Sequence, residues 1–222
     1  MQDFLILIWC LFVSCAATWR DWFLVLVFGI FGSSMQATAI KKIVITGPES
    51  TGKTSLCQQL AEHFHTEWCP EYAREYLLKH GMNYSYDDLL TIAKGQIALE
   101  ESQESVIAIR RPAEKQHHSL LFIDTDMYVM KVWCEFVFGK CHPFILEQIA
   151  KRKYDLYLFC GVDLPWVKDE LREYPDLETR EKLYHIYKNI LINQPVPWVE
   201  ISGSYEERLQ KAIAAVSLHL KE

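Results

Sequence analysis

Apolar residues along the chain follow two alternating patterns. Five short apolar runs, rich in β-branched or aromatic residues, have the form of buried strands; they are Lys41–Thr46, Thr66–Cys69, Leu120–Asp126, Tyr154–Cys160 and Val196–Ile201. Between them, apolar residues recur at helical spacing; these segments are Thr54–His65, Glu71–Leu78, Ser85–Arg110, Met127–Phe138, Pro143–Lys151 and the stretch that follows Ser204. Because strands and helices alternate, we predict an α/β fold with a mostly parallel five-stranded sheet flanked by helices on both faces.

Capping residues mark the starts of two of the predicted helices. Ser85 precedes the acidic pair Asp87-Asp88, which is typical of a helix N-terminus. Ser204 and Glu207 have the spacing of a capping box, in which each side chain bonds to the backbone of the other residue. We therefore predict a last amphipathic helix that begins directly after Ser204.

The stretch between the first strand and the first helix matches the phosphate-binding loop pattern G-x-x-x-x-G-K-[ST]. In that context backbone N–H groups and the positive end of the helix dipole surround the phosphates of ATP. Lys53 would reach the β- and γ-phosphates and act in catalysis, and the hydroxyl group of Thr54 would ligate Mg²⁺. The predicted ATP-binding residues of this loop are Gly47, Glu49, Ser50, Thr51, Gly52, Lys53, Thr54 and Ser55.

Acidic residues follow two of the predicted strands. The strand Leu120–Asp126 ends in carboxylates, and a carboxylate beside a phosphate loop can hold Mg²⁺ or accept a proton from an attacking hydroxyl group. We predict Asp124 as the metal or base carboxylate. Asp126, expected on the same side of an extended chain, is the alternative base and a substrate contact. Glu71 and Arg74 are predicted to meet the acceptor substrate, or else to form only a solvated helix start.

The segment from Asp163 to Lys182 is dense in charges of both signs and contains Arg172 and Arg180. One interpretation is a mobile segment that closes over the γ-phosphate, in which Arg172 serves catalysis and Arg180 binds ATP. The other is a solvated, salt-bridged helical face.

Composition narrows the classes of partner. The 222-residue chain carries a formal net charge of −6, which argues against a general nucleic-acid binder, because neutralising a phosphate backbone needs an excess of Lys and Arg. Its seven cysteines include no Cys-x-x-Cys pair, which indicates reduced thiols in a cytoplasmic protein. His117-His118 and Cys141-His142 lack further ligands at suitable spacing, so neither pair is expected to bind a metal. The sequence indicates a small-molecule partner and does not indicate an oligomeric state.

Residues 4–31 are almost wholly apolar but contain Arg20 and Asp21. A single membrane span would place both charges near the bilayer centre, at about 2.5–3.5 kcal/mol each. A signal peptide would begin with basic residues, and Asp3 occupies that region instead. We therefore predict that residues 1–39 lie outside the fold and that residues 40–222 form the phosphate-loop domain. Our preferred hypothesis is that residues 1–34 result from a start assigned too early, with Met35 as the native start; a membrane anchor is the alternative.

Other phosphate-loop classes lack support in the sequence. It contains no Asn-Lys-x-Asp guanine motif, no LSGGQ-like signature and no motor-type helical lid domain after the fifth strand, which leaves a compact small-molecule kinase. Six motifs in order resemble the NadR-like family of phosphate-loop ATPases and kinases, in particular the ribosylnicotinamide kinase domain of bacterial NadR proteins. These motifs are Gly47–Thr54, Glu71–Tyr76, Ile92–Gln96, Phe122–Asp126, Gly139–Phe144 and Pro165–Arg172.

The resemblance implies a sheet of nucleoside-monophosphate-kinase type with a lid. It also implies transfer of the ATP γ-phosphate to the 5′-hydroxyl group of nicotinamide riboside, with Asp124 as the catalytic or Mg²⁺-linked carboxylate and Arg172 in the lid. Trp133 and Trp166 are both candidates for stacking on the nicotinamide ring, although for Trp133 a core role is favoured. NadR proteins usually carry an adenylyltransferase domain before the kinase, and no His-x-Gly-His motif occurs here, so we predict no adenylyl transfer. The alternative is a NadR-like regulatory ATPase without nucleoside kinase activity.

Overall fold

The computed structural model describes residues 39–110 and 119–221. All of these residues belong to one unit, which begins at Ala39. The predictions for the leader (apart from Ala39) and for His117-His118 lie outside the described residues. Among the residues that are described, no helix combines the length and the apolar character that a membrane span needs.

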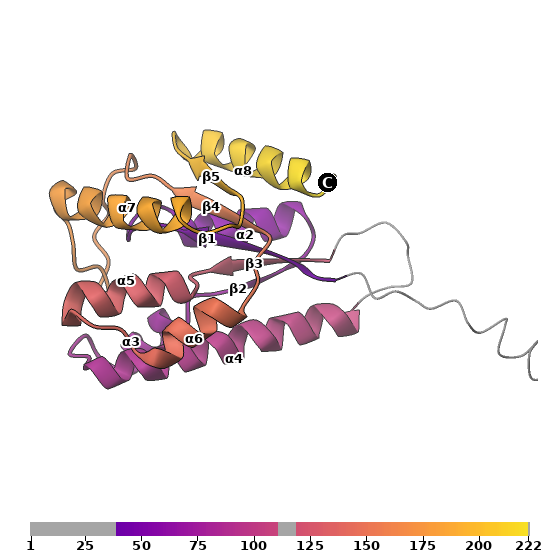
Figure 1. Ribbon diagram of the computed structural model, residues 1–222. Helices are drawn as coiled ribbons and strands as arrows, with labels where there is room; N and C mark the ends of the chain where they lie inside the picture. The colour runs from indigo at the N-terminus through magenta and orange to yellow at the C-terminus, as the bar shows by residue number, and fades with distance from the viewer. Residues whose placement is uncertain (1–38, 111–118, 222) are drawn as a thin grey trace, which may run out of the picture. The chain divides into compact units, whose positions relative to one another are not determined.

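The described residues contain five strands, which form one sheet with parallel neighbours throughout (Figure 1). The strands are β1 (Lys41–Thr46), β2 (Glu67–Cys69), β3 (Leu120–Asp124), β4 (Leu156–Cys160) and β5 (Trp198–Ile201). Their order is β2-β3-β1-β4-β5, so β1 is central. Strands β3 and β4 are buried along their whole length, as expected for strands covered on both faces. The predicted fold class is thus confirmed.

Helices cover both faces of the sheet (Figure 1). On one face, α2 (Lys53–His63) and α8 (Tyr205–His219) pack against the strands through residues such as Leu60 and Val216. On the other face, the helices α4 (Tyr86–Arg110), α5 (Met127–Phe138) and α7 (Leu177–Ile192) contribute to a second apolar cluster. A third cluster joins α4 and α5 to α3 (Tyr72–His80) and α6 (Pro143–Lys151). Because β3, β1 and β4 are parallel neighbours, their carboxyl ends lie side by side at one edge of the sheet, between the two layers of helices.

Most predicted elements appear within two residues of their expected bounds. The capping box of α8 is present, with Ser204 and Glu207 each bonded to the other's backbone. The main difference is α7. The charged segment from Asp163 to Lys182 becomes helical only at its end, where Asp176 accepts a hydrogen bond from Thr179 N at 2.7 Å and starts a helix that continues to Ile192. The buried residues Leu183, Tyr187 and Leu191 explain why this helix packs on the sheet.

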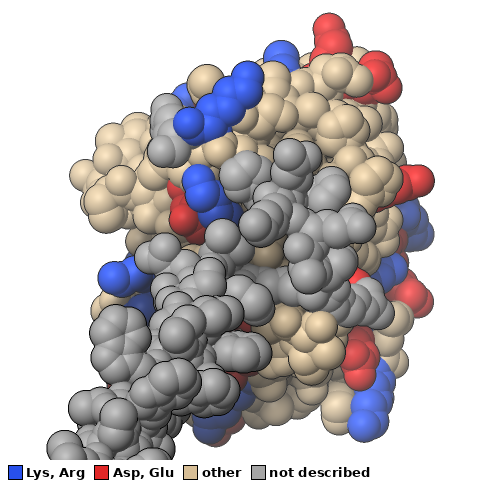
Figure 2. Space-filling view, turned by 90° about the vertical axis from the view of Figure 1, so that its right-hand side faces the viewer, with Lys and Arg blue, Asp and Glu red and all other residues tan. Residues whose placement is uncertain are grey.

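The charged surface is mixed on the face drawn in Figure 2. Where described residues are visible there, Lys and Arg side chains lie dispersed among Asp and Glu side chains and form no continuous basic surface.

Candidate active site

The loop between β1 and α2 is tightly curved. Thr51 Oγ1 and Lys53 Nζ each donate a hydrogen bond to the carbonyl oxygen of Pro48, at 2.8 Å, and so hold the loop closed on itself. Gly47 has a φ of +137°, and a Cβ atom there would lie 2.7 Å from the carbonyl oxygen of Cys160, so only glycine fits. Ser50 also adopts a positive φ, of 56°. A curved loop that leads into the N-terminus of α2 has the geometry of an anion-binding nest.

Asp124 lies directly beneath this loop. It ends β3 opposite Ile45 of β1, and its Oδ2 accepts a hydrogen bond from Thr54 Oγ1 at 2.5 Å. Its Oδ1 is buried without a hydrogen-bond partner among the described residues. Burial and the nearby charge of Glu71 raise the pKa of Asp124 to about 7, while Lys53 and the Thr54 hydroxyl group act in the opposite direction. A hydroxyl group beside an unsatisfied carboxylate oxygen is a donor set that suits Mg²⁺.

The expectation that Asp126 lies on the same side of the chain as Asp124 is wrong. Thr125 has a φ of +81°, so the backbone turns between the two carboxylates instead of remaining extended. Asp126 caps α5 by accepting hydrogen bonds from Tyr128 N and Val129 N, and it accepts a third from Tyr157 Oη at 3.0 Å. Its carboxylate is therefore used to position α5 on the opposite face of the sheet from Thr54.

A cavity of about 220 Å³ opens next to the phosphate loop. It brings together most of the predicted site residues; they are Gly47, Glu49, Ser50, Thr51, Gly52, Lys53, Thr54, Ser55, Glu71, Arg74 and Arg172. Asp124 is not among the described residues that line the cavity; it lies behind Thr54, whose hydroxyl group donates a hydrogen bond to it. One end of the cavity, formed by the phosphate loop, thus offers Lys53 and backbone N–H groups, which suit an anion.

The other end of this cavity is aromatic, and of its residues only Trp133 was named from the sequence as a stacking candidate. Trp133 and Phe136 from α5 line it, together with Tyr174 and Tyr187. Phe136 and Tyr174 meet edge to face, with ring centroids 5.4 Å apart. The signal in the sequence was the spacing of Trp133 and Phe136 on one side of a helix, which is equally typical of a core. Trp166, the other stacking candidate, lines a second cavity instead.

The motif Ile92–Gln96 positions the wall that carries Glu71 and Arg74. Gln96 is buried, and its side chain accepts a hydrogen bond from Tyr72 N at 2.7 Å and donates one to the carbonyl oxygen of Pro70 at 3.2 Å. Gly95 lies in α4, and a Cβ atom there would collide with the ring of Tyr72, the first residue of α3. Helix α4 therefore needs glycine where it contacts the start of α3. The motif thus fixes the position of the start of α3 beside the cavity.

A loop segment, residues 165–174, covers one side of the phosphate loop. The carboxylate of Glu49 accepts hydrogen bonds from the backbone N–H groups of Glu173 at 3.0 Å and Tyr174 at 2.7 Å, and from the indole N–H of Trp166 at 3.4 Å. Ser50 Oγ accepts another, from Val167 N at 3.1 Å. Arg172, within the segment, donates to the carbonyl oxygen of Val167. We call residues 165–174 the lid segment.

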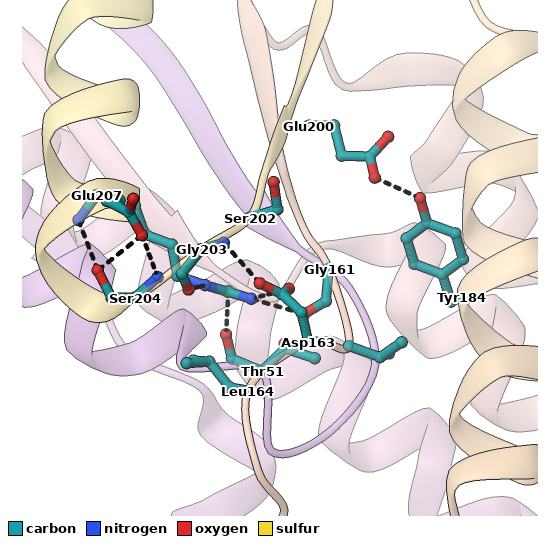
Figure 3. A network of polar contacts seen from close by, with 12 residues as sticks. Thr51, Gly161, Asp163, Leu164, Tyr184, Glu200, Ser202, Gly203, Ser204 and Glu207 are labelled. Carbon is teal, nitrogen blue, oxygen red and sulfur yellow. Dashed lines mark hydrogen bonds and ion pairs between the residues drawn. The ribbon is translucent and has the colours of Figure 1, made fainter.

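A buried arginine, Arg208 of α8, holds the other side of the phosphate loop. Its partners Thr51, Gly161, Asp163 and Gly203 are labelled in Figure 3. It donates hydrogen bonds to the carbonyl oxygens of Thr51 at 2.8 Å, Gly161 at 3.0 Å and Gly203 at 2.9 Å, and it pairs with Asp163. Asp163 also accepts from Gly203 N at 2.5 Å. Sequence reasoning missed this residue, because nothing local distinguishes it from other charged positions at the start of a helix.

The second cavity, of about 790 Å³, adjoins this arginine cluster. Its lining includes Gly161, Asp163, Trp166, Arg180 and Gly203. Arg180 lies in the first turn of α7 and not in a loop, with Nη2 at 3.2–3.5 Å from the carbonyl oxygens of Ser50, Val162 and Leu164. The second cavity is thus lined by Arg180, which contacts Ser50 of the phosphate loop, and not by the loop itself.

Comparison with known proteins agrees with this geometry. The profile of a family described as AAA domain matches residues 42–208. Two curated relatives are the proteins called trifunctional NAD biosynthesis/regulator protein NadR, from Escherichia coli strain K12 (27% identical over 183 residues) and Salmonella typhimurium strain LT2 (28% over 182 residues). Each match covers 80% of this chain and 42% of the relative, so the chain spans less than half of these relatives. The predicted resemblance to NadR is confirmed.

Solved structures show the same fold. A NadR protein in complex with NR has a TM-score of 0.67 at 24% identity, over 81% of this chain and 49% of that protein. A NadR protein in complex with NAD and AMP-PNP has a TM-score of 0.60 at 23% identity, over 82% and 50%. Thymidylate kinase from Ehrlichia chaffeensis has a TM-score of 0.55 at 14% identity, over 80% of this chain and 99% of that enzyme. The last of these agrees with the expected likeness to nucleoside-monophosphate kinases.

Proposed function

The chain belongs to the AAA domain family, and from that premise we propose that it is an ATP-dependent kinase that transfers the γ-phosphate of ATP to a hydroxyl group of a nucleoside. The observation that carries the proposal is a single cavity with two unlike ends. The phosphate loop and Lys53 line one end, and Trp133 and Tyr174 line the other. An anionic donor and an aromatic acceptor would therefore meet inside one cavity.

The nucleotide would lie with its phosphates on the loop. Lys53 Nζ, now bonded to the carbonyl oxygen of Pro48, is within the cavity and would exchange that bond for phosphate oxygens. Thr54 and Asp124 would hold Mg²⁺, which when bound neutralises charge on the phosphates. The second cavity, on the Arg180 side of the loop, has room for the rest of the nucleotide.

The preferred acceptor is nicotinamide riboside, whose pyridinium ring is a flat cation. Aromatic faces and carboxylates both attract such a ring, and the cavity offers Trp133, Tyr174 and Glu173. A solved NadR relative with the same fold was crystallised in complex with NR, which supports this choice. The low sequence identity leaves other nucleosides to be tested beside it.

Glu71 is the group best placed to receive the proton of the attacking hydroxyl. It lines the cavity, and its side chain makes no capping bond to α3. As the acceptor oxygen bonds to the γ-phosphorus, the bond to the β-phosphate oxygen breaks, ADP leaves and the hydroxyl proton passes to Glu71. Lys53 and Arg172 stabilise the charge on the transferring group, and the enclosing wall excludes water.

A panel of acceptors tests the proposal. ADP release and product mass are measured with nicotinamide riboside, uridine, cytidine, thymidine and adenosine, each with ATP and Mg²⁺. We expect one nucleoside to stimulate ADP release with formation of its monophosphate. A response that is flat across the panel would contradict the kinase and would favour the regulatory ATPase.

Lys53→Ala tests the site itself. Loss of the cation that contacts the transferring phosphate should lower kcat at least about 100-fold, the usual cost of one preorganised donor. Lys151→Ala is the control, because Lys151 is exposed and, among the described residues, forms an ion pair with Glu147 of the same helix, α6. Activity of Lys53→Ala equal to that of the control would refute the assigned role.

A further inference from the structure

A continuous series of polar contacts connects the phosphate loop to the aromatic end of the cavity. Glu49 accepts from the backbone N–H of Glu173 at 3.0 Å. The carboxylate of Glu173 accepts from Tyr84 Oη at 2.9 Å, and Tyr84 Oη accepts from the indole N–H of Trp133 at 2.9 Å. Tyr84 and Trp133 also pack edge to face, with ring centroids 5.0 Å apart. The lid segment therefore lies between the two ends of the cavity and is bonded to both.

Glu49 places a negative charge within the phosphate loop. A carboxylate within a phosphate loop repels the phosphates that the loop binds, and the repulsion grows as water is excluded. Here three donors of the lid segment, the N–H groups of Glu173, Tyr174 and Trp166, hold the carboxylate. Charge-assisted bonds of this kind are strong. A seated lid segment thus disperses the charge of Glu49, whereas a displaced segment would leave it bare beside the phosphates.

A second contact joins the lid segment to α3, which lines the cavity through Arg74. Arg74 of α3 forms a two-pronged ion pair with Asp169, at 3.1 and 3.3 Å. This pair is exposed, so it contributes little free energy by itself, but it restricts where the lid segment can lie. The lid segment, in one position, thus contacts the phosphate loop through Glu49 and contacts both α3 and Tyr84.

We propose that Glu49 is a positioning residue that couples the two substrate sites: by holding Glu173 and Tyr174 it places the Tyr84–Trp133 wall, so that nucleotide and nucleoside each bind more tightly when the other is bound. The inference rests on the proposed kinase function. Phosphates on the loop favour the seated lid segment, because only the seated segment disperses the charge of Glu49. The seated segment in turn orders the aromatic wall that holds the nucleoside.

The coupling is reciprocal, as binding equilibria require. A factor of roughly tenfold in the Kd of either ligand lies within the usual range for two linked sites. The same factor must appear whichever ligand is added first.

The test measures nucleoside binding by calorimetry on the full chain. The probe is the best acceptor of the panel, titrated with and without a non-hydrolysable ATP analogue and Mg²⁺. In the wild-type protein we expect the analogue to lower the acceptor Kd roughly tenfold. In Glu49→Gln we expect the ratio of the two Kd values to fall to within about twofold of one, because the amide removes the charge and replaces one of the two acceptor oxygens with a donor that faces N–H groups.

Two further variants separate coupling from general damage. Tyr84→Phe removes the hydroxyl group between Glu173 and Trp133 while it keeps the ring, and it should also abolish the ratio. Glu170→Gln makes the same chemical change as Glu49→Gln at an exposed position in the lid segment, and it should retain the wild-type ratio. If Glu49→Gln fails to fold, Tyr84→Phe still decides the question.

The outcomes distinguish this inference from the proposed function. Wild-type protein that neither binds nor phosphorylates any nucleoside would overturn the kinase function and the coupling with it. Wild-type protein that phosphorylates a nucleoside but shows a ratio near one, or keeps its ratio in Glu49→Gln and Tyr84→Phe, would overturn the coupling alone.

Discussion

The two sides of the phosphate loop are supported by contacts of different kinds. On one side the buried guanidinium of Arg208 binds the carbonyl oxygens of Thr51, Gly161 and Gly203. On the other side the lid segment reaches Glu49 and Ser50 through contacts that are exposed or only partly buried. Contacts sheltered from water keep their geometry, whereas contacts open to water exchange easily with it.

This difference suggests separate roles for the two sides of the phosphate loop. The Arg208 side fixes the backbone that would cradle phosphates, which need donors in place before they bind. The lid side, whose contacts exchange with water more easily, is the side that we expect to open for substrate entry and product release. A loop held equally firmly on both sides would have the right shape but no access.

The fixed side should be the more sensitive to mutation. Arg208→Met keeps the length of the side chain but leaves three carbonyl oxygens and Asp163 without their partner, so we expect a loss of about 3 kcal/mol in the free energy of unfolding. Arg180→Met is the matched control, since Arg180 is also buried but makes longer contacts, of 3.2–3.5 Å, to carbonyl oxygens only. Urea unfolding measures both; equal losses would remove the distinction between Arg208 and Arg180.

A smaller effect is expected from the buried carboxylate beneath the loop. Burial, with the charge of Glu71, raises the pKa of Asp124 from 3.8 to about 7, and burial raises that of Asp126 to about 7. Between about pH 4 and pH 7 the folded protein therefore binds more protons than the unfolded chain. Since stability falls with pH where the folded state holds the extra protons, the nucleotide-free protein should lose stability as pH rises through this window.

The size of the pH effect follows from the same two carboxylates. From pH 5 to pH 7 each contributes of the order of 2 kcal/mol or less. Asp124→Asn removes one of them, so the slope of unfolding free energy against pH should fall by roughly half when measured with EDTA and without nucleotide. A profile parallel to that of the wild-type protein would show that Asp124 ionises normally in the folded state.

The smallest free energies should belong to opening of the lid side. Amide hydrogens of Val167, Glu173 and Tyr174 are bonded to side chains near the surface, so they should exchange at least about tenfold faster than those in the buried half of β1. Hydrogen exchange with mass spectrometry measures the difference. A non-hydrolysable ATP analogue should slow the lid amides and leave β1 unchanged; equally slow exchange in both regions would mean that the lid segment does not open on its own.

The parts that sequence could predict depend on neighbours in the chain. The strand, loop and helix around Gly47–Thr54 follow from local periodicity and one motif, and α5 and α6 follow from apolar spacing and from Pro143 at a helix start. Asp124 was predicted beneath the loop because the carboxyl ends of parallel strands meet at one edge of the sheet. These inferences need no knowledge of distant contacts.

The parts that were missed depend on distant contacts or on rare backbone conformations. Arg208 binds Thr51 across 157 residues, and Glu49 binds Tyr174 across 125 residues, so neither partner is visible locally. Asp126 was placed on the wrong face because Thr125 adopts a positive φ, which is uncommon for a β-branched residue. The helix α7 was missed because dense charge concealed the later apolar positions Leu183 and Tyr187.

The sheet order also has a consequence for synthesis on the ribosome. The central strand β1 is the first to emerge among the described strands, yet both of its neighbours, β3 and β4, come much later in the chain. The backbone N–H and C=O groups of β1 stay unpaired until β3 and β4 have left the exit tunnel. This delay favours slow folding and exposes the nascent chain to aggregation. A chaperone that shields β1 during translation should therefore raise the yield of native protein more than one added after release.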